Sequence, residues 1–184
     1  WDNGGVRWGE DNEEGRKLHS QRSVEIRCLA HGELAEPAEP LSVALSGPLA
    51  KFCELPELSV AGSGRLWLIV RHLTDLTPNI MRAGGRRSQD RGIWNPYALC
   101  YDGSRWSQPQ QLPDSSGRND MRVCTCLDRD GRAWAAWADD GRTKARPPEP
   151  QNHNVHAVPL SVPGPAKVIL ETRTVGHATP APRR

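Results

Sequence analysis

Residues 118–120 place a cation, an amide and a carboxylate side by side, as Arg118, Asn119 and Asp120. An Arg guanidinium can bind a carboxylate through two parallel hydrogen bonds, and Asn and Asp side chains can hold sugar hydroxyls. The alternative is structural, because Asn and Asp often close loops through hydrogen bonds to nearby backbone, which would leave Arg118 in solvent. For the cluster we favour contact with a ligand or a neighbouring domain. The full set of expected ligand-binding residues is Arg118, Asn119, Asp120, Arg122, Lys51 and Glu54.

Other residue types that often do chemistry show no pattern of an active or metal site. His153 and His156 are three residues apart without helical spacing, so we expect lone surface side chains rather than a metal pair. Ser, His and Asp occur without a nucleophile elbow, so nothing favours acyl transfer. We expect neither a metal nor a cofactor, and the sequence identifies no catalytic residue.

The chain has five cysteines, and an odd number does not form a complete disulfide framework. Cys124 and Cys126 are two residues apart in an expected strand, so both side chains should share a face and pack as small buried groups. A zinc site would need a Cys-x-x-Cys pair with a second pair or histidines, which the sequence lacks. We therefore expect buried structural thiols at Cys28, Cys53, Cys100, Cys124 and Cys126.

The composition favours a β-rich fold. The chain of 184 residues contains 17 Gly and 16 Pro, and its 7 Trp outnumber 2 Tyr and 1 Phe. Many turn residues with Trp near the turns are typical of propellers and other all-β arrays. The formal net charge is only +2, and no apolar stretch is long enough to span a membrane. We therefore expect neither a nucleic-acid nor a membrane partner.

Two stretches of the chain have nearly the same hairpin pattern. Gly64 and Trp67 in the first match Gly131 and Trp134 in the second, 67 residues further on. Each stretch is typical of a strand, a tight turn containing Gly, and a strand with Trp three residues after the Gly. Such repetition indicates a repeat architecture. The expected strands are residues 24–29, 34–41, 57–60, 65–73, 97–101, 105–112, 122–127, 132–138, 154–160 and 167–172.

Short turns and long polar connections alternate along these strands. In a four-stranded propeller blade, this alternation places all the short turns on one face and all the long connections on the other. The sequence therefore predicts an all-β fold, a partial β-propeller of about two and a half four-stranded antiparallel blades from a larger propeller of about six or seven blades. The expected parts are a loop of an incomplete first blade (1–23), its outer hairpin (24–41), a second blade (55–112), a third blade (121–173) and a Pro-rich linker (174–184).

The face with the long connections is the expected functional face, because binding residues concentrate on such loops. The residues that lead into each innermost strand should lie nearest the central channel. They include Lys51 and Glu54 in one blade, and residues 118–122 in the next. We also expect the chain to be a piece of a longer protein, because an open propeller would leave exposed sheet edges.

The pattern Asp-x-x-Gly-x-x-Trp from Asp128 to Trp134 resembles the inner hairpin of bacterial propellers of the sialidase (BNR-like) and two-component-regulator type. Residues 101–109 resemble their outer hairpin, and the resemblance covers about residues 24–173. A sialidase Asp box reads Ser-x-Asp-x-Gly-x-Thr-Trp, whereas this chain has Leu127 and Arg129 at the Ser and Asp positions. Residues 117–122 are similar to a motif of propellers that precede a PHP-like metal-dependent hydrolase domain, whose His/Asp metal signature this chain lacks.

The expected function is that of a non-catalytic propeller segment, a scaffold or a carbohydrate- or protein-binding module of a larger bacterial protein, secreted or periplasmic. Its expected partners are a carbohydrate or small anionic ligand, the remaining blades, and an adjacent domain of the same protein. The alternative is part of a sialidase-like propeller glycosidase whose catalytic groups lie partly outside this chain. We favour the first, because glycosidase chemistry needs a pair of carboxylates that the sequence does not identify.

Overall fold

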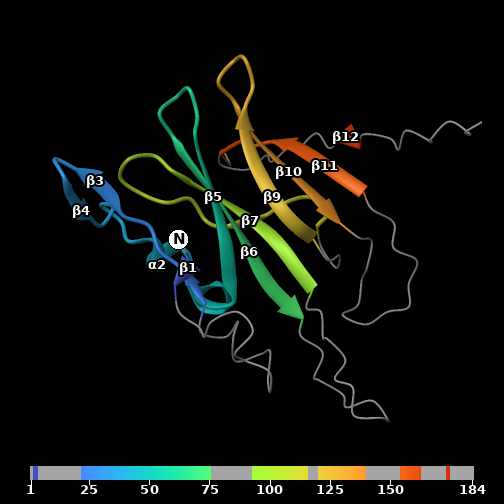
Figure 1. Ribbon diagram of the computed structural model, residues 1–184, viewed down its shortest axis with the longest axis horizontal. Coiled ribbons are helices and arrows are strands. Elements are labelled where there is room, and N and C mark those ends of the chain that lie inside the picture. Colours follow the sequence, from blue (N-terminus) through green and yellow to red (C-terminus); the bar gives the residue numbers. More distant parts are fainter. Residues whose placement is uncertain are drawn as a thin grey trace, which may run out of the picture.

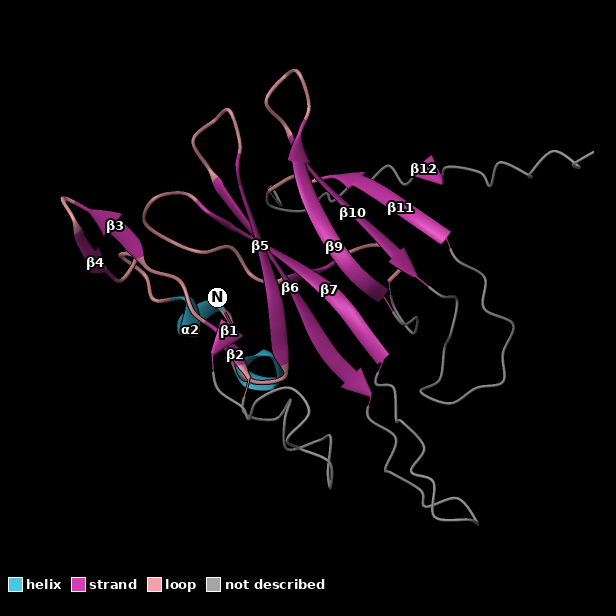
Figure 2. Ribbon diagram, in the orientation of Figure 1, coloured by secondary structure: helices cyan, strands magenta, loops and turns pink. Residues whose placement is uncertain are grey.

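The computed structural model describes residues 2–3, 22–75, 93–115, 120–139, 154–162 and 173–174, which form antiparallel sheets with one short α-helix (Figure 2). The prediction of an all-β fold is therefore confirmed. Within these ranges, no helix is long and apolar enough to cross a membrane. In chain order the elements are β1 Asp2–Asn3, β2 Ser23–Val24, β3 Cys28–Ala30, β4 Glu33–Ala35, α2 Leu41–Ala44, the 3-10 helix η1 Gly47–Ala50, β5 Cys53–Val60, β6 Leu66–Asp75, β7 Ile93–Tyr101, β8 Gln110–Gln111, β9 Asp120–Leu127, β10 Ala133–Asp139, β11 Asn154–Pro159 and β12 Arg173–Thr174.

Two four-stranded sheets make up most of this fold (Figure 1). The first sheet has the order β5-β6-β7-β8 and the second the order β12-β11-β10-β9. In both sheets, strands that are consecutive in the sequence therefore pair with each other. The pairing places two tryptophans at the same position, because Trp67 lies opposite Ser59 and Trp134 lies opposite Cys126. Two smaller sheets pair β1 with β2 and β3 with β4.

The tight turns of the two inner hairpins, residues 61–65 and 128–132, touch each other at one end of the sheets (Figure 1, top). The Gly62 N–H donates to the Gly131 carbonyl at 2.8 Å. Gly64 and Gly131 have positive φ angles of 77° and 75°, a conformation that glycine adopts without steric cost. A Cβ on Gly131 would also lie 3.1 Å from the Cα of Gly62. We call this end of the sheets the turn end and the opposite end, where the long connections begin, the loop end.

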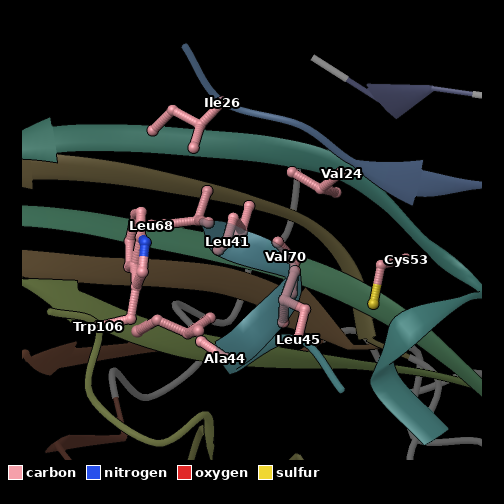
Figure 3. Close-up of a cluster of buried hydrophobic side chains, with 10 residues drawn as sticks. Val24, Ile26, Leu41, Ala44, Leu45, Cys53, Leu68, Val70 and Trp106 are labelled. Atoms are coloured by element: carbon pink, nitrogen blue, oxygen red, sulfur yellow. The ribbon is translucent and has the colours of Figure 1, made fainter. Parts of the chain in front are cut away.

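Strand β6 carries apolar side chains on both faces. Leu68 and Val70 point to one face of the first sheet, and Trp67 and Ile69 to the other, as the alternation of a strand requires. Residues between β2 and β5 cover the first of these faces (Figure 3). This core cluster contains Val24, Ile26, Leu41, Ala44, Leu45, Cys53, Leu68, Val70, Leu99 and Trp106.

The second core cluster joins the two sheets face to face. Trp67 and Ile69 of the first sheet pack in it with Ala135 and Trp137 of the second. Only one face of β10 takes part, because burial alternates strictly along this strand from Ala133 to Asp139. The cluster contains Ala61, Trp67, Ile69, Ala98, Cys100, Leu112, Ala133, Ala135, Trp137 and Val158.

Some of the expected strand boundaries are wrong. The strand expected at 34–41 ends at Ala35, because Pro37 and Pro40 cannot donate the hydrogen bonds of a sheet ladder. The strand expected at 24–29 is divided between β2 and β3, and the one expected at 105–112 is reduced to β8 after Pro109. The strand expected at 167–172 lies entirely outside the described residues.

The expectation of five buried thiols is only partly correct. Cys53 and Cys100 are buried and all five cysteines are free, but Cys28, Cys124 and Cys126 are exposed. Cys124 and Cys126 do share a face of β9, yet it is the face turned away from the first sheet. Strand periodicity predicts which side chains share a face, but not whether another layer covers that face.

Candidate functional site

The buried polar side chains of the described chain gather at the loop end. They stand where β5, β7 and β11 begin and where β6 and β10 end, or pack against these positions. Buried polar groups need hydrogen-bonding or ionic partners, so this end must be built with specific contacts. The residues are Arg22, Glu54, His72, Asn95, Ser115, Asp139 and His156.

A buried carboxylate, that of Glu54, organises the loop end of the first sheet. Glu54 is fully buried and lies opposite Arg71 in the strand ladder, which brings the two charges into a direct ion pair. Arg22 approaches the same carboxylate, with 3.5 Å between its Nη1 and Oε2 of Glu54. The Arg71 guanidinium also lies over the ring of Trp94, 4.2 Å from its centroid, which is a cation–π contact. Two guanidinium groups therefore converge on one carboxylate beneath the surface.

Cys53 and His72 lie opposite each other in the same ladder but do not form a reactive pair. Burial, together with the charge of Glu54, raises the pKa of the Cys53 thiol to about 12, so the thiol stays protonated and is a poor nucleophile. Burial lowers the pKa of His72, and its hydrogen bond with the Pro48 carbonyl, 3.1 Å from Nε2, opposes part of this effect. A neutral His72 that donates from Nε2 fits this position, where it also meets the Tyr97 ring edge-on.

Asn95 fixes the segment that follows β8. Its amide nitrogen donates to the Ser115 carbonyl, and its Oδ1 accepts from the Thr74 hydroxyl at 2.7 Å. The Ser115 hydroxyl in turn donates to the Leu112 carbonyl at 2.6 Å. These bonds hold the chain close to the loop end just before the residues that lead into β9.

The loop end of the second sheet contains a buried Asp–His pair. Oδ2 of Asp139 lies 2.5 Å from Nε2 of His156, and the Asn154 amide donates to the other carboxylate oxygen at 3.4 Å. The imidazole of His156 stacks on the Trp137 ring with a centroid distance of 5.2 Å. His156 is only 4% exposed, so the expectation of a surface histidine is wrong. His153 lies outside the described residues.

The expected ligand-binding residues fall into four groups. Lys51 and Arg122 are exposed, whereas Glu54 is buried in the ion pair described above. Asp120 opens β9 opposite Asp139, so its backbone stands at the loop end. Arg118 and Asn119 lie outside the described residues.

The residues expected in a site from the sequence do not include Arg71, Asn95 or Asp139. A signal for Arg71 exists, because a cation within an apolar run such as 66–73 needs a partner if both faces of the strand are buried. The described residues contain no group of three or more His, Cys, Asp and Glu side chains that could hold a metal ion.

The segment that resembles an Asp box has a structural role at the opposite, turn end. The carboxylate of Asp128 accepts hydrogen bonds from Nε1 of Trp134 at 3.0 Å and from the backbone N–H groups of Asp130 and Arg132, both at 2.9 Å. These bonds, the one from Trp134 foremost, lower the pKa of Asp128 to about 2. Asp128 thus closes its turn and is remote from the loop end.

No family model, curated protein or solved structure matches this chain.

Proposed function

We propose that this chain is a segment of a β-propeller of the sialidase-like (BNR-like) superfamily, in which the two four-stranded sheets are successive blades. Three features support this proposal. Each sheet begins with a tight inner hairpin, the sheets pack face to face, and their inner-hairpin turns meet at the same end. Residues 22–50 would contribute the outer part of a preceding blade, with the β3–β4 hairpin at its rim.

We further propose that the loop end is a non-catalytic binding surface for carbohydrate, with acidic sugars as the first candidates. The main support for this proposal is that the buried polar groups converge at the loop end, where the exposed side chains of Lys51 and Arg122 add positive charge. A rigid, internally hydrogen-bonded base beneath charged side chains is what a preformed sugar or anion site requires. The same surface could instead contact an adjacent domain of the same protein, such as a hydrolase domain.

A propeller glycosidase is the alternative function. It would need two carboxyl groups free to act as acid and as base or nucleophile. Glu54 is held by Arg71 and Arg22, and Asp139 is held by His156. Glu54 is therefore engaged in ion pairs and Asp139 in a hydrogen bond within the fold, which favours a supporting role for them over catalysis.

The proposal is tested by binding assays with substitutions at both ends of the molecule. A Lys51→Ala, Arg122→Ala double variant and a separate Arg118→Ala, Asn119→Ala, Asp120→Ala variant should each lose affinity for an acidic oligosaccharide, such as a sialylated or polyuronic fragment, in calorimetry. The matched control is Arg129→Ala with Arg132→Ala, which removes two exposed positive charges at the turn end. Equal losses in all variants would indicate non-specific charge attraction, and unchanged affinity in the loop-end variants would reject the site.

A further inference from the structure

Two exposed thiols lie next to each other on an edge strand of the second sheet. Cys124 and Cys126 are two residues apart on β9, and their cross-strand neighbours on β10 are Ala136 and Trp134 (Figure 1). Both cysteines are exposed and free. Side chains two residues apart on a strand share a face, so the two sulfurs are presented together. The edge of the sheet therefore carries a pair of accessible sulfur ligands.

The spacing of these thiols does not suit a disulfide bond between them. Two residues along a strand span about 6.8 Å, and Cβ atoms on one face are separated by nearly the same distance. A disulfide needs Cβ atoms only about 3.8 Å apart. Cys124 and Cys126 would have to leave the ladder with β10 to form one. They therefore remain two separate ligands.

The same spacing suits a metal ion held between two sulfurs on opposite sides of it. Metal–thiolate bonds of about 2.3 Å place the two sulfurs about 4.6 Å apart. Side chains on a strand lean along its direction, so each sulfur has to move only about 1 Å toward the other. The Cys124 thiol donates a weak hydrogen bond to the Ala136 carbonyl, with 3.6 Å between Sγ and the oxygen. A thiolate cannot donate this bond, so loss of the proton frees the sulfur to turn toward Cys126.

The number and the type of the ligands select the ion. Zinc takes four ligands, and within the described ranges no group of three or more His, Cys, Asp or Glu side chains could hold a metal ion. This does not extend to an ion that needs only two ligands. Thiolates are soft ligands that favour Cu(I), which bonds to two sulfurs in a line.

We propose that Cys124 and Cys126 form a two-coordinate Cu(I) site. Binding breaks both S–H bonds, releases two protons to water and forms two S–Cu bonds. Copper stays Cu(I), so the step needs no oxidant or reductant. The bound form carries one net negative charge, because two thiolates surround one monovalent cation. Arg122, exposed on the same strand two residues before Cys124, supplies a positive charge that offsets it.

The site stays accessible in the blade arrangement of the proposed function. Glu57 of β5 stands at the position of Cys124, 67 residues earlier in the chain. Its cross-strand partner Ile69 is buried in the core between the two sheets, yet Glu57 itself is exposed. Ser59, at the position of Cys126, is half-buried. A further sheet packed on the second sheet in the same way would therefore leave Cys124 open to solvent. The inference goes beyond sugar binding and does not depend on it.

Anaerobic titration of the reduced protein with Cu(I), in competition with a chromophoric Cu(I) chelator, tests the site. We expect one Cu(I) per chain and a thiolate-to-copper absorption band in the ultraviolet. Cys124→Ser and Cys126→Ser should each weaken binding by about a hundredfold or more, because only one thiolate remains. Cys28→Ser removes a lone exposed thiol and should leave the affinity unchanged. All three side chains are exposed, so the variants keep the core of the fold. An affinity for Cu(I) that is the same in all three variants would overturn the proposal.

A further variant keeps the number of thiols and changes only their geometry. Thr125 points to the other face of β9, where its Oγ1 donates to the Leu58 carbonyl at 3.4 Å. Thr125→Cys combined with Cys126→Ser therefore places the two thiols on opposite faces of the strand. This double variant should bind Cu(I) as weakly as Cys126→Ser alone. Full affinity in the double variant, or one Cu(I) shared by two chains in light scattering after size-exclusion chromatography, would contradict the site. Sugar binding is measured separately, so its failure would not affect this outcome.

Discussion

The two four-stranded sheets share one pairing pattern but differ in what covers them. The central strands β6 and β7 of the first sheet are buried on both faces, and β6 begins with an unbroken apolar run from Leu66 to Val70. The second sheet is buried on one face, and in its strand β10 buried positions alternate with half-buried ones. The same hairpin pattern, Gly-x-x-Trp, therefore serves in two environments. The difference shows that the layers on either side of a sheet, rather than the hairpin itself, decide which residues carry the stability.

The largest contrast should come from the two equivalent tryptophans. Trp67 lies in the core between the sheets, so Trp67→Ala should lower the free energy of unfolding by about 3–5 kcal/mol. Trp134 is half-buried on the face of β10 that is turned away from the first sheet, and Trp134→Ala should cost only about 1 kcal/mol. Denaturant unfolding of both variants measures the difference. Equal costs would mean that Trp134 contributes as much packing as Trp67 does.

The second-largest loss of stability should come from the buried charges at the loop end of the first sheet. Glu54→Gln would leave Arg71 and Arg22 without their shared carboxylate and should cost about 3–5 kcal/mol, the usual result of breaking a buried ion pair. Glu57 lies on the same strand but is exposed, so Glu57→Gln should change stability by less than about 0.5 kcal/mol. A small effect of Glu54→Gln would show that water reaches the two guanidinium groups.

The two inner turns provide a smaller contrast. Gly64→Ala should cost about 1 kcal/mol, because alanine is strained at a positive φ although the space around Gly64 is open. Gly131→Ala carries the same strain and also brings its Cβ within 3.1 Å of the Gly62 backbone, which should add about 1 kcal/mol or more. Thermal unfolding of the two variants would compare them. Equal melting temperatures would mean that the two turns can move apart to accommodate the Cβ without a loss of stability.

The sequence predicts the local parts of this fold well. The structure contains the tight turns predicted from Gly64, Gly131 and the Asp102-Gly103 pair, and the strands next to these turns lie close to their expected positions. These signals are local, because a turn depends on the φ angles of a few residues. The expected strand boundaries were wrong where proline interrupts a strand, as at Pro37 and Pro40.

The contacts between distant segments were not predictable in this way. Glu54 was expected near the binding face, but its partner Arg71 comes from the next strand and Arg22 from before the sheet. Likewise, the spacing of Cys124 and Cys126 gives a shared face without saying what lies above it. Which charged side chains pair, and which sheet faces are covered by another layer, depends on the whole fold. The residue pattern of a single strand therefore cannot specify either.

The smallest effect should come from Asp128, where the second inner turn differs from the first. The first turn has Ala61 at this position, whereas Asp128 accepts the Trp134 and backbone hydrogen bonds of its turn. Those bonds lower the pKa of Asp128 to about 2, below the value of about 3.9 for an unfolded chain. A carboxyl with a lowered pKa stabilises the fold above pH 4, and this contribution is lost as the pH falls towards 2.

Asp128→Ala should therefore be slightly less stable than the wild-type chain at pH 7, and the gap should narrow as the pH falls from 4 towards 2. Urea unfolding at several pH values would follow the gap, and a carbon-13 NMR titration would give the pKa of the carboxyl directly. The variant makes the second turn chemically like the first, with its Ala61. A gap that is independent of pH would mean that Asp128 acts through its shape, and that the two turns differ in packing rather than in charge.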